Sequence, residues 1–173
     1  MEGGQKPMNE KVSGNIRKWC ALMVAVFLYY FIHEGSHLVI ALLYGVFQEI
    51  RFLGAGVQVA IHTELLTENQ MVIFNIAGSV STLIGAWIFI GLTPLFTKMK
   101  NKFFRACGYY ITIALMFIDP IYLSFLYRFF GGGDMNGILL SGVPEMAAQL
   151  VFVIIGIIHI LLFWKWVHPL YKK

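Results

Sequence analysis

Charged residues are scarce in this sequence, and their scarcity argues against a soluble fold. Only 13% of the 173 residues are Asp, Glu, Lys or Arg, whereas 58% are hydrophobic. Soluble domains carry about 25% charged residues, so a chain of this composition would expose apolar surface to water. The basic residues lie in short flanks of apolar runs and form no continuous patch, so we expect no nucleic-acid partner.

Cysteine is also scarce, which argues against a thiol-based scaffold or metal site. The two cysteines, Cys20 and Cys107, each lie near the start of an apolar run, and neither belongs to a CxxC or similar spacing. We therefore expect two reduced thiols without a disulfide.

Long apolar runs dominate what the sequence does contain. A membrane-spanning helix needs about 20 largely apolar residues, and four such runs are present. They predict an all-α polytopic membrane protein. Its first expected partner is therefore the lipid bilayer. We expect one membrane-embedded domain over residues 19–167, with tails at 1–18 and 168–173. The four helices are expected at about 19–44, 71–93, 106–130 and 145–167.

The segment between the first two runs has a different pattern. Apolar and polar residues alternate around Gly54 and Gly56 within residues 45–70, which is typical of a short β-hairpin and not of a helix. We expect Pro94 to end the second helix, and the glycines at 131–133 to end the third. A short helical piece is then expected over residues 134–141, with Asp134 as its N-cap.

The distribution of basic residues predicts the topology. Four spans place the basic residues of the N-terminal tail, of the 98–105 connection and of the C-terminal end on one side of the membrane. The positive-inside rule makes that side cytoplasmic. We therefore predict a multi-pass integral membrane protein with both termini in the cytoplasm. Five acidic residues fall on the opposite side: Glu49, Glu64, Glu68, Asp134 and Glu145.

One motif in the first run carries chemistry. In a helix, His33 and His37 lie one turn apart on the same face, where two imidazoles can bind one zinc ion. Glu34 projects beside them and can take a proton from a zinc-bound water. Ionisable residues within a bilayer cost about 3 kcal/mol each, so three in five positions require a compensating partner. The motif therefore predicts Zn²⁺ as cofactor.

A catalytic zinc usually has three protein ligands, so a third must come from elsewhere. The depth of the two histidines in the first helix favours Asp134, which follows the third helix on the outer side. Asp119, just before Pro120, is the main alternative. The remaining candidates are Glu64, Glu68, Glu145, His62 and His159.

The chain resembles the site-2 protease family of intramembrane zinc metalloproteases. The resemblance is carried by His33-Glu34-Gly35-Ser36-His37 in an early apolar helix, the hairpin-like segment, a small-residue helix and a later segment containing Asp134. It implies that His33, His37 and Asp134 hold zinc and that Glu34 is the catalytic acid/base. The sequence departs from the family pattern in lacking a proline near Gly78 and in having Gly137 late after Asp134.

These observations favour an intramembrane zinc metalloendopeptidase. Its substrate partner is expected to be a transmembrane or membrane-adjacent segment of another membrane protein, cut by Glu-assisted attack of zinc-bound water. One alternative is a membrane metallopeptidase with a surface-facing site and Glu64 or Glu145 as third ligand. The other is a non-catalytic, zinc-stabilised membrane protein, or pseudoprotease.

Overall fold

The chain folds into a bundle of four long helices with a small hairpin at one end. The computed structural model describes residues 8–53, 56–130 and 133–172. Each of the four helical runs is long and apolar enough to cross a membrane. The helices are α1 (Met8–Leu43), α2 (Glu68–Thr97), α3 (Lys102–Ile121), α4 (Gly133–Leu140), α5 (Glu145–Leu162) and α6 (His168–Lys172).

Two of the long runs contain irregular turns. After Ile121, α3 continues as a π-helical turn, η2 (Tyr122–Leu126), and a 3-10 turn, η3 (Tyr127–Phe129). In the same way, η4 (Phe163–Val167) is a π-helical turn that joins α5 to α6. Pro120 lies shortly before η2 and removes one backbone donor from the last turn of α3.

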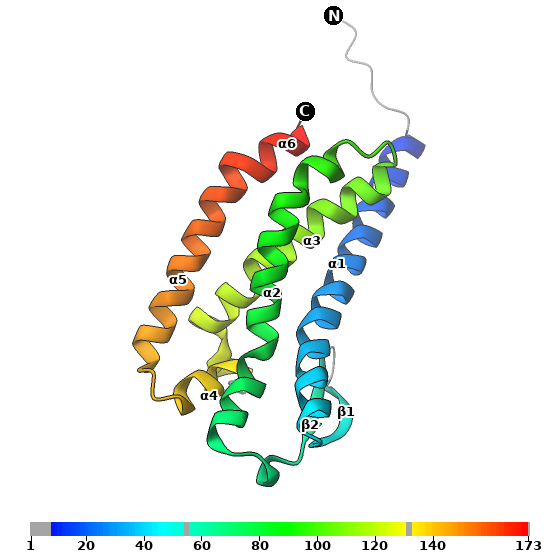
Figure 1. The fold of residues 1–173 in the computed structure, drawn as a ribbon. Helices are drawn as coiled ribbons and strands as arrows, with labels where there is room; N and C mark the ends of the chain where they lie inside the picture. Colours follow the sequence, from blue (N-terminus) through cyan, green and yellow to red (C-terminus); the bar gives the residue numbers. More distant parts are fainter. Residues whose placement is uncertain (1–7, 54–55, 131–132, 173) are drawn as a thin grey trace, which may run out of the picture.

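Helices α1, α2 and α3 pack against one another, and α5 packs against α3 (Figure 1). Their shared core contains fully buried alanines, among them Ala21, Ala25 and Ala86, which let helix backbones approach closely. Both described chain ends lie at the same end of the bundle, whereas the hairpin and α4 lie at the other. This arrangement gathers the segments before and after α4 at the hairpin end.

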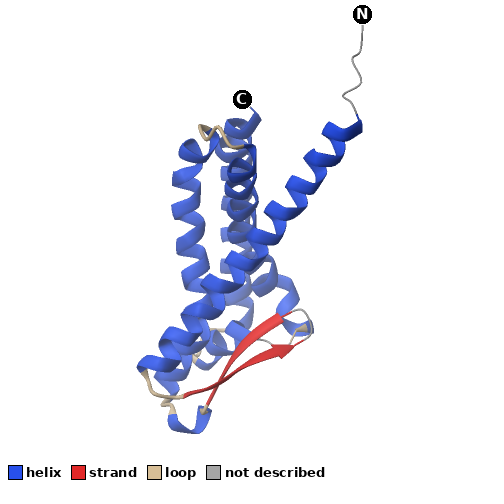
Figure 2. Cartoon of the chain, turned by 90° about the vertical axis from the view of Figure 1, so that its right-hand side faces the viewer, coloured by secondary structure: helices blue, strands red, loops and turns tan. Residues whose placement is uncertain are grey.

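The predicted hairpin is confirmed. Strands β1 (Phe47–Leu53) and β2 (Gly56–Ile61) pair antiparallel, with an irregularity in register between Phe47 and Glu49. Val46 and Val59 pack with Phe74 of α2 in a small core that fixes the hairpin against the bundle. Figure 2 shows the two strands crossing beside the lower part of α1. Gly54, at the expected turn, lies outside the described residues.

The helix boundaries differ from the predicted ones. α1 begins at Met8, so the expected N-terminal tail is helical from residue 8 to residue 18. A single glycine at position 14 costs about 1 kcal/mol in a helix, too little to stop one that continues into a long apolar run. α2 runs to Thr97 and contains Pro94. The expected C-terminal tail is also helical, as α6, up to Lys172.

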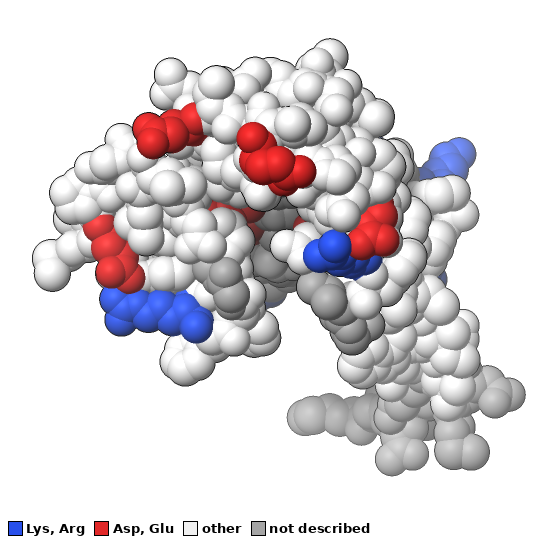
Figure 3. Space-filling view, turned by 90° about the horizontal axis from the view of Figure 1, so that it is seen from below, with Lys and Arg blue, Asp and Glu red and all other residues white. Residues whose placement is uncertain are grey.

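Large apolar side chains cover the outside of the bundle. Exposed examples occur on all four long runs, including Phe27, Trp87, Phe104 and Ile157. Seen from the hairpin end, acidic side chains outnumber basic ones (Figure 3). The basic connection between α2 and α3 lies at the other end. An apolar belt between two polar ends of different charge is what a membrane-spanning bundle requires.

Candidate metal centre

Helix α1 presents His33 and His37 on its inner face, close to its C-terminal end. The two imidazole rings lie 5.1 Å apart between centroids. They are four positions apart, so about one helical turn places them on the same side of α1. His37 is buried, and the His33 side chain is only 12% exposed.

The hydrogen bond of His37 fixes which ring nitrogen is free. Its Nδ1 lies 2.8 Å from the backbone carbonyl oxygen of Phe74 in α2. A carbonyl can only accept, so Nδ1 carries the proton and Nε2 keeps its lone pair. A backbone carbonyl behind one imidazole nitrogen is the usual way in which a metal-ligating histidine is oriented.

A glycine in α2 makes room for both rings. A Cβ atom on Gly78 would lie 2.5 Å from His33 Nε2 and 2.6 Å from His37 Nε2. Real Cβ atoms do not approach other atoms so closely, so only glycine leaves both Nε2 atoms in place. Gly78 therefore keeps a small space open where the two lone pairs meet.

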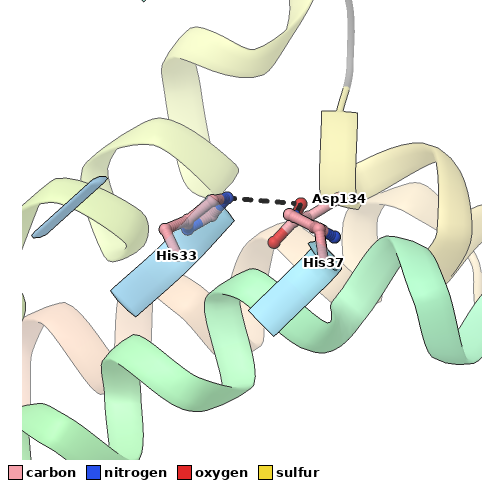
Figure 4. Close-up of side chains that lie close together, drawn as sticks. All are labelled: His33, His37 and Asp134. Atoms are coloured by element: carbon pink, nitrogen blue, oxygen red, sulfur yellow. Dashed lines mark ion pairs between the residues drawn. The ribbon is translucent and has the colours of Figure 1, made fainter. Parts of the chain in front are cut away.

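Asp134 enters this space from the first turn of α4 (Figure 4). Its Oδ2 accepts a 2.8 Å hydrogen bond from the backbone N–H of Ser79 in α2. Its Oδ1 lies 3.3 Å from His37 Nε2 and 3.6 Å from His33 Nε2. Asp134 thus lies within α4 and turns its carboxylate toward α1 and α2, in place of the predicted N-cap role.

The charge state of Asp134 suits a ligand. Burial would raise the pKa of its carboxyl group, but hydrogen bonds and charges from His33 and His37 outweigh burial and hold the pKa below its ordinary value. An ionised carboxylate is the form that binds a metal ion. The electrostatics of the site therefore keep Asp134 in the state that a ligand requires.

The distances fit a small metal ion. One ligand atom each from His33, His37 and Asp134 lie within 4.8 Å of one another. Zinc binds such atoms at about 2.0–2.2 Å, which places neighbouring ligands of a tetrahedral site about 3.3 Å apart. The two histidine-to-aspartate distances of 3.3 and 3.6 Å are close to that value. Two imidazoles and one carboxylate can hold a metal ion and leave a coordination position open.

Glu34, the predicted acid/base, lies beside this group. It is half-buried and directly follows His33 in α1. Its Oε2 accepts a 3.1 Å hydrogen bond from the backbone N–H of Val59 in β2. The hairpin thus contacts Glu34, the carboxylate of the His33–His37 motif, which does not belong to the possible metal-binding group.

Asp119, the main alternative ligand, lies on the far side of His33. Its Oδ1 is 3.6 Å from His33 Nδ1, the nitrogen that points away from Asp134. It is fully buried and accepts hydrogen bonds from Tyr29 and Thr82. Asp119 therefore contacts a candidate ligand without being part of the group that meets at Gly78.

The other candidate ligands are used elsewhere. Glu145 pairs with Arg128 at 2.7 Å near the ends of the segment that carries Asp134. His62 and Glu64 contact each other at 3.1 Å on the exposed turn after β2. Glu68 is exposed in the first turn of α2, and His159 Nδ1 lies 2.6 Å from the Met116 carbonyl oxygen.

Several residues that shape the site were not identified from the sequence. In the sequence, Gly78 is one of several small residues of the second apolar run, and the role of the Ser79 N–H depends on a contact between helices distant in sequence. Tyr29 could have been found, because it lies one helical turn before His33 on the same face of α1. Gly137 allows close packing of α4 on Asn75, since a Cβ there would overlap the Asn75 side chain.

Comparison of the chain with protein-family models, with curated proteins and with solved structures gave no match.

Proposed function

We propose that His33, His37 and Asp134 bind a zinc ion within the membrane. The observation that carries the proposal is the meeting of His33 Nε2, His37 Nε2 and Asp134 Oδ1 at the space left by Gly78. Among the described residues, the ion pairs of Asp119 and Asp134 involve only histidines. Two buried carboxylates in an apolar bundle need a cation, and a divalent metal ion supplies one.

The chemistry that we propose is hydrolysis of a peptide bond. When bound, zinc lowers the pKa of a coordinated water to about 7 and polarises a carbonyl group. Glu34 accepts the proton of the attacking water and returns it to the departing amine nitrogen. His33, His37 and Asp134 hold the metal and leave one position for water and substrate. The resemblance of the His33–His37 segment to the site-2 protease family supports this assignment of roles.

The proposed substrate is a membrane-spanning or membrane-adjacent segment of another protein. The four long apolar helices support insertion in a bilayer, and the cluster lies toward the hairpin end of the bundle. His37 is six residues from the end of α1, which corresponds to about 9 Å along the helix. A helical substrate must unwind locally there, because its amides are otherwise engaged in helical hydrogen bonds.

The substitution Glu34→Gln tests the proposed reaction. Gln keeps the shape of Glu34 but cannot take a proton, so we expect bound zinc to remain while cleavage falls by about 10²–10⁴-fold. The experiment co-expresses each variant with candidate membrane substrates and measures cleavage and zinc content in the same preparations. Glu64→Gln, on the exposed turn, is the matched control and should retain both.

The result also separates the proposed enzyme from a zinc-stabilised protein without catalysis. If Glu34→Gln keeps both its zinc and the full biological activity of the wild type, proteolysis by this site is wrong. If the wild-type preparation cuts a membrane substrate and Glu34→Gln does not, the pseudoprotease alternative is excluded.

A further inference from the structure

A second carboxylate lies in the middle of the bundle, behind the candidate metal centre. Asp119 of α3 is 0% exposed and lies 3.6 Å, through Oδ1, from Nδ1 of His33. Tyr29 donates its hydroxyl hydrogen to the same oxygen at 2.6 Å, and the Thr82 hydroxyl donates to Oδ2. Helices α1, α2 and α3 thus contribute Tyr29, Thr82 and Asp119 in turn.

This group determines the tautomer of His33. The Tyr29 oxygen also lies 3.5 Å from His33 Nδ1. Tyr29 has one hydroxyl hydrogen, which it gives to Asp119, so its oxygen can only accept from the imidazole. The Asp119 carboxylate can likewise only accept. Nδ1 therefore carries the proton, and in the neutral ring that binds a metal the lone pair lies on Nε2, which faces Asp134.

The Asp119 charge also complements a metal ion. Its hydrogen-bond donors, Tyr29 and Thr82, are neutral, and no Lys or Arg pairs with it in the part of the chain that the structure describes. A divalent ion held by two neutral imidazoles and Asp134 retains one positive charge. Asp119, one imidazole away, neutralises that charge where the surroundings are apolar.

We propose that Asp119 is the positioning residue of the metal centre, with Tyr29 and Thr82 holding its carboxylate in place. It orients the His33 ring, fixes its tautomer and increases its basicity toward the metal. This inference rests on the proposed zinc site but not on proteolysis.

The test measures the zinc dissociation constant of purified protein in detergent by competition with a chromogenic chelator. Asp119→Asn should weaken zinc binding by about 10–100-fold, the usual effect of losing such a partner. Tyr29→Phe and Thr82→Val should each weaken it several-fold. Thr112→Val is the matched control, because Thr112 is also fully buried but its hydroxyl bonds only within α3, to Gly108.

A second readout separates positioning from simple stability. The visible absorption spectrum of the Co²⁺-substituted protein reports the ligand geometry, so it should change in Asp119→Asn and stay unchanged in Thr112→Val. The two threonine variants each lose one buried hydroxyl, but only Thr82→Val should bind zinc more weakly. If Asp119→Asn does not fold, the zinc affinities of Tyr29→Phe and Thr82→Val test the positioning role instead.

The outcomes distinguish this inference from the proposed function. Wild-type protein that binds zinc, together with Asp119, Tyr29 and Thr82 variants whose affinity and Co²⁺ spectrum match the wild type, would overturn the positioning role alone. Wild-type protein that binds neither zinc nor Co²⁺ would overturn the metal centre and this inference together.

Discussion

Gly78 is the residue on which the meeting of the two histidines depends most directly. A Cβ atom at this position of α2 would lie within 2.6 Å of both Nε2 atoms, and glycine has none. The remaining polar contacts hold the ligands from behind: Phe74 behind His37, and Ser79 behind Asp134. His37 and Asp134 are thus each held through one polar atom, while the other, Nε2 or Oδ1, faces the candidate metal position.

Gly78→Ala should reduce zinc binding at least about tenfold, because the new methyl group would occupy the space between the histidines and displace both rings. Gly91→Ala is the matched control, since Gly91 lies on the same helix and a Cβ there meets nothing within 4 Å. Zinc content and affinity are measured for both proteins. Equal binding by Gly78→Ala and wild type would mean that the metal does not lie at this point.

Part of the candidate site was predictable from the sequence at this scale. The spacing of His33 and His37 sets their relative position in any helix, whatever the rest of the chain does. The choice between Asp134 and Asp119 was open because both lie far along the chain, and their distances to His33 depend on how α3 and α4 pack. The structure brings both to His33, one at each ring nitrogen.

At the scale of elements, a proline removes one helical hydrogen bond from α3, and a side chain of α5 replaces it. Pro120 has no N–H, so the Met116 carbonyl four residues earlier loses its usual helical partner. His159 of α5 contacts this carbonyl through Nδ1 at 2.6 Å and is fully buried. His159 therefore supplies the polar contact that the proline leaves open in α3.

His159→Leu should destabilise the bundle by about 1–3 kcal/mol, because it leaves the Met116 carbonyl buried without a partner. In Pro120→Ala, the backbone N–H of residue 120 can bond that carbonyl, so the same change at position 159 should cost less. A double-mutant cycle of unfolding free energies in detergent measures this coupling. Strictly additive effects of the two changes would contradict the explanation.

The helices and the hairpin were predicted more accurately than the residues at which the helices begin and end. The four long apolar runs and the alternating segment after the first gave the helices and the hairpin. The ends were misplaced because local breakers are weak inside long helices. Gly14 and Pro94 both lie within helices, and the carbonyl freed by a proline in an apolar helix can be satisfied by neighbouring groups.

At the scale of the whole molecule, the two ends of the bundle differ in charge and in structure. One end carries the described chain ends and the basic connection that contains Lys98 and Lys100. The other carries the hairpin and α4, and on the face seen there acidic side chains outnumber basic ones (Figure 3). In the topology that we propose, the basic end faces the cytoplasm and the candidate metal centre lies nearer the outer surface.

Labelling of single cysteines tests this topology. In a background with Cys20 and Cys107 replaced by alanine, a membrane-impermeant maleimide should label Glu64→Cys in intact cells. Lys100→Cys should be labelled only after the membrane is opened, because Lys100 is exposed at the basic end. Labelling of Lys100→Cys but not Glu64→Cys in intact cells would reverse the orientation.

The most direct measurement of the central claim is the zinc content per chain of purified wild type, Asp134→Ala and Glu145→Ala. We predict about one zinc ion per chain in wild type and in Glu145→Ala, and a large loss in Asp134→Ala, because of these two carboxylates Asp134 is the one grouped with His33 and His37. Equal zinc in all three proteins, or loss in Glu145→Ala alone, would contradict the metal centre described above.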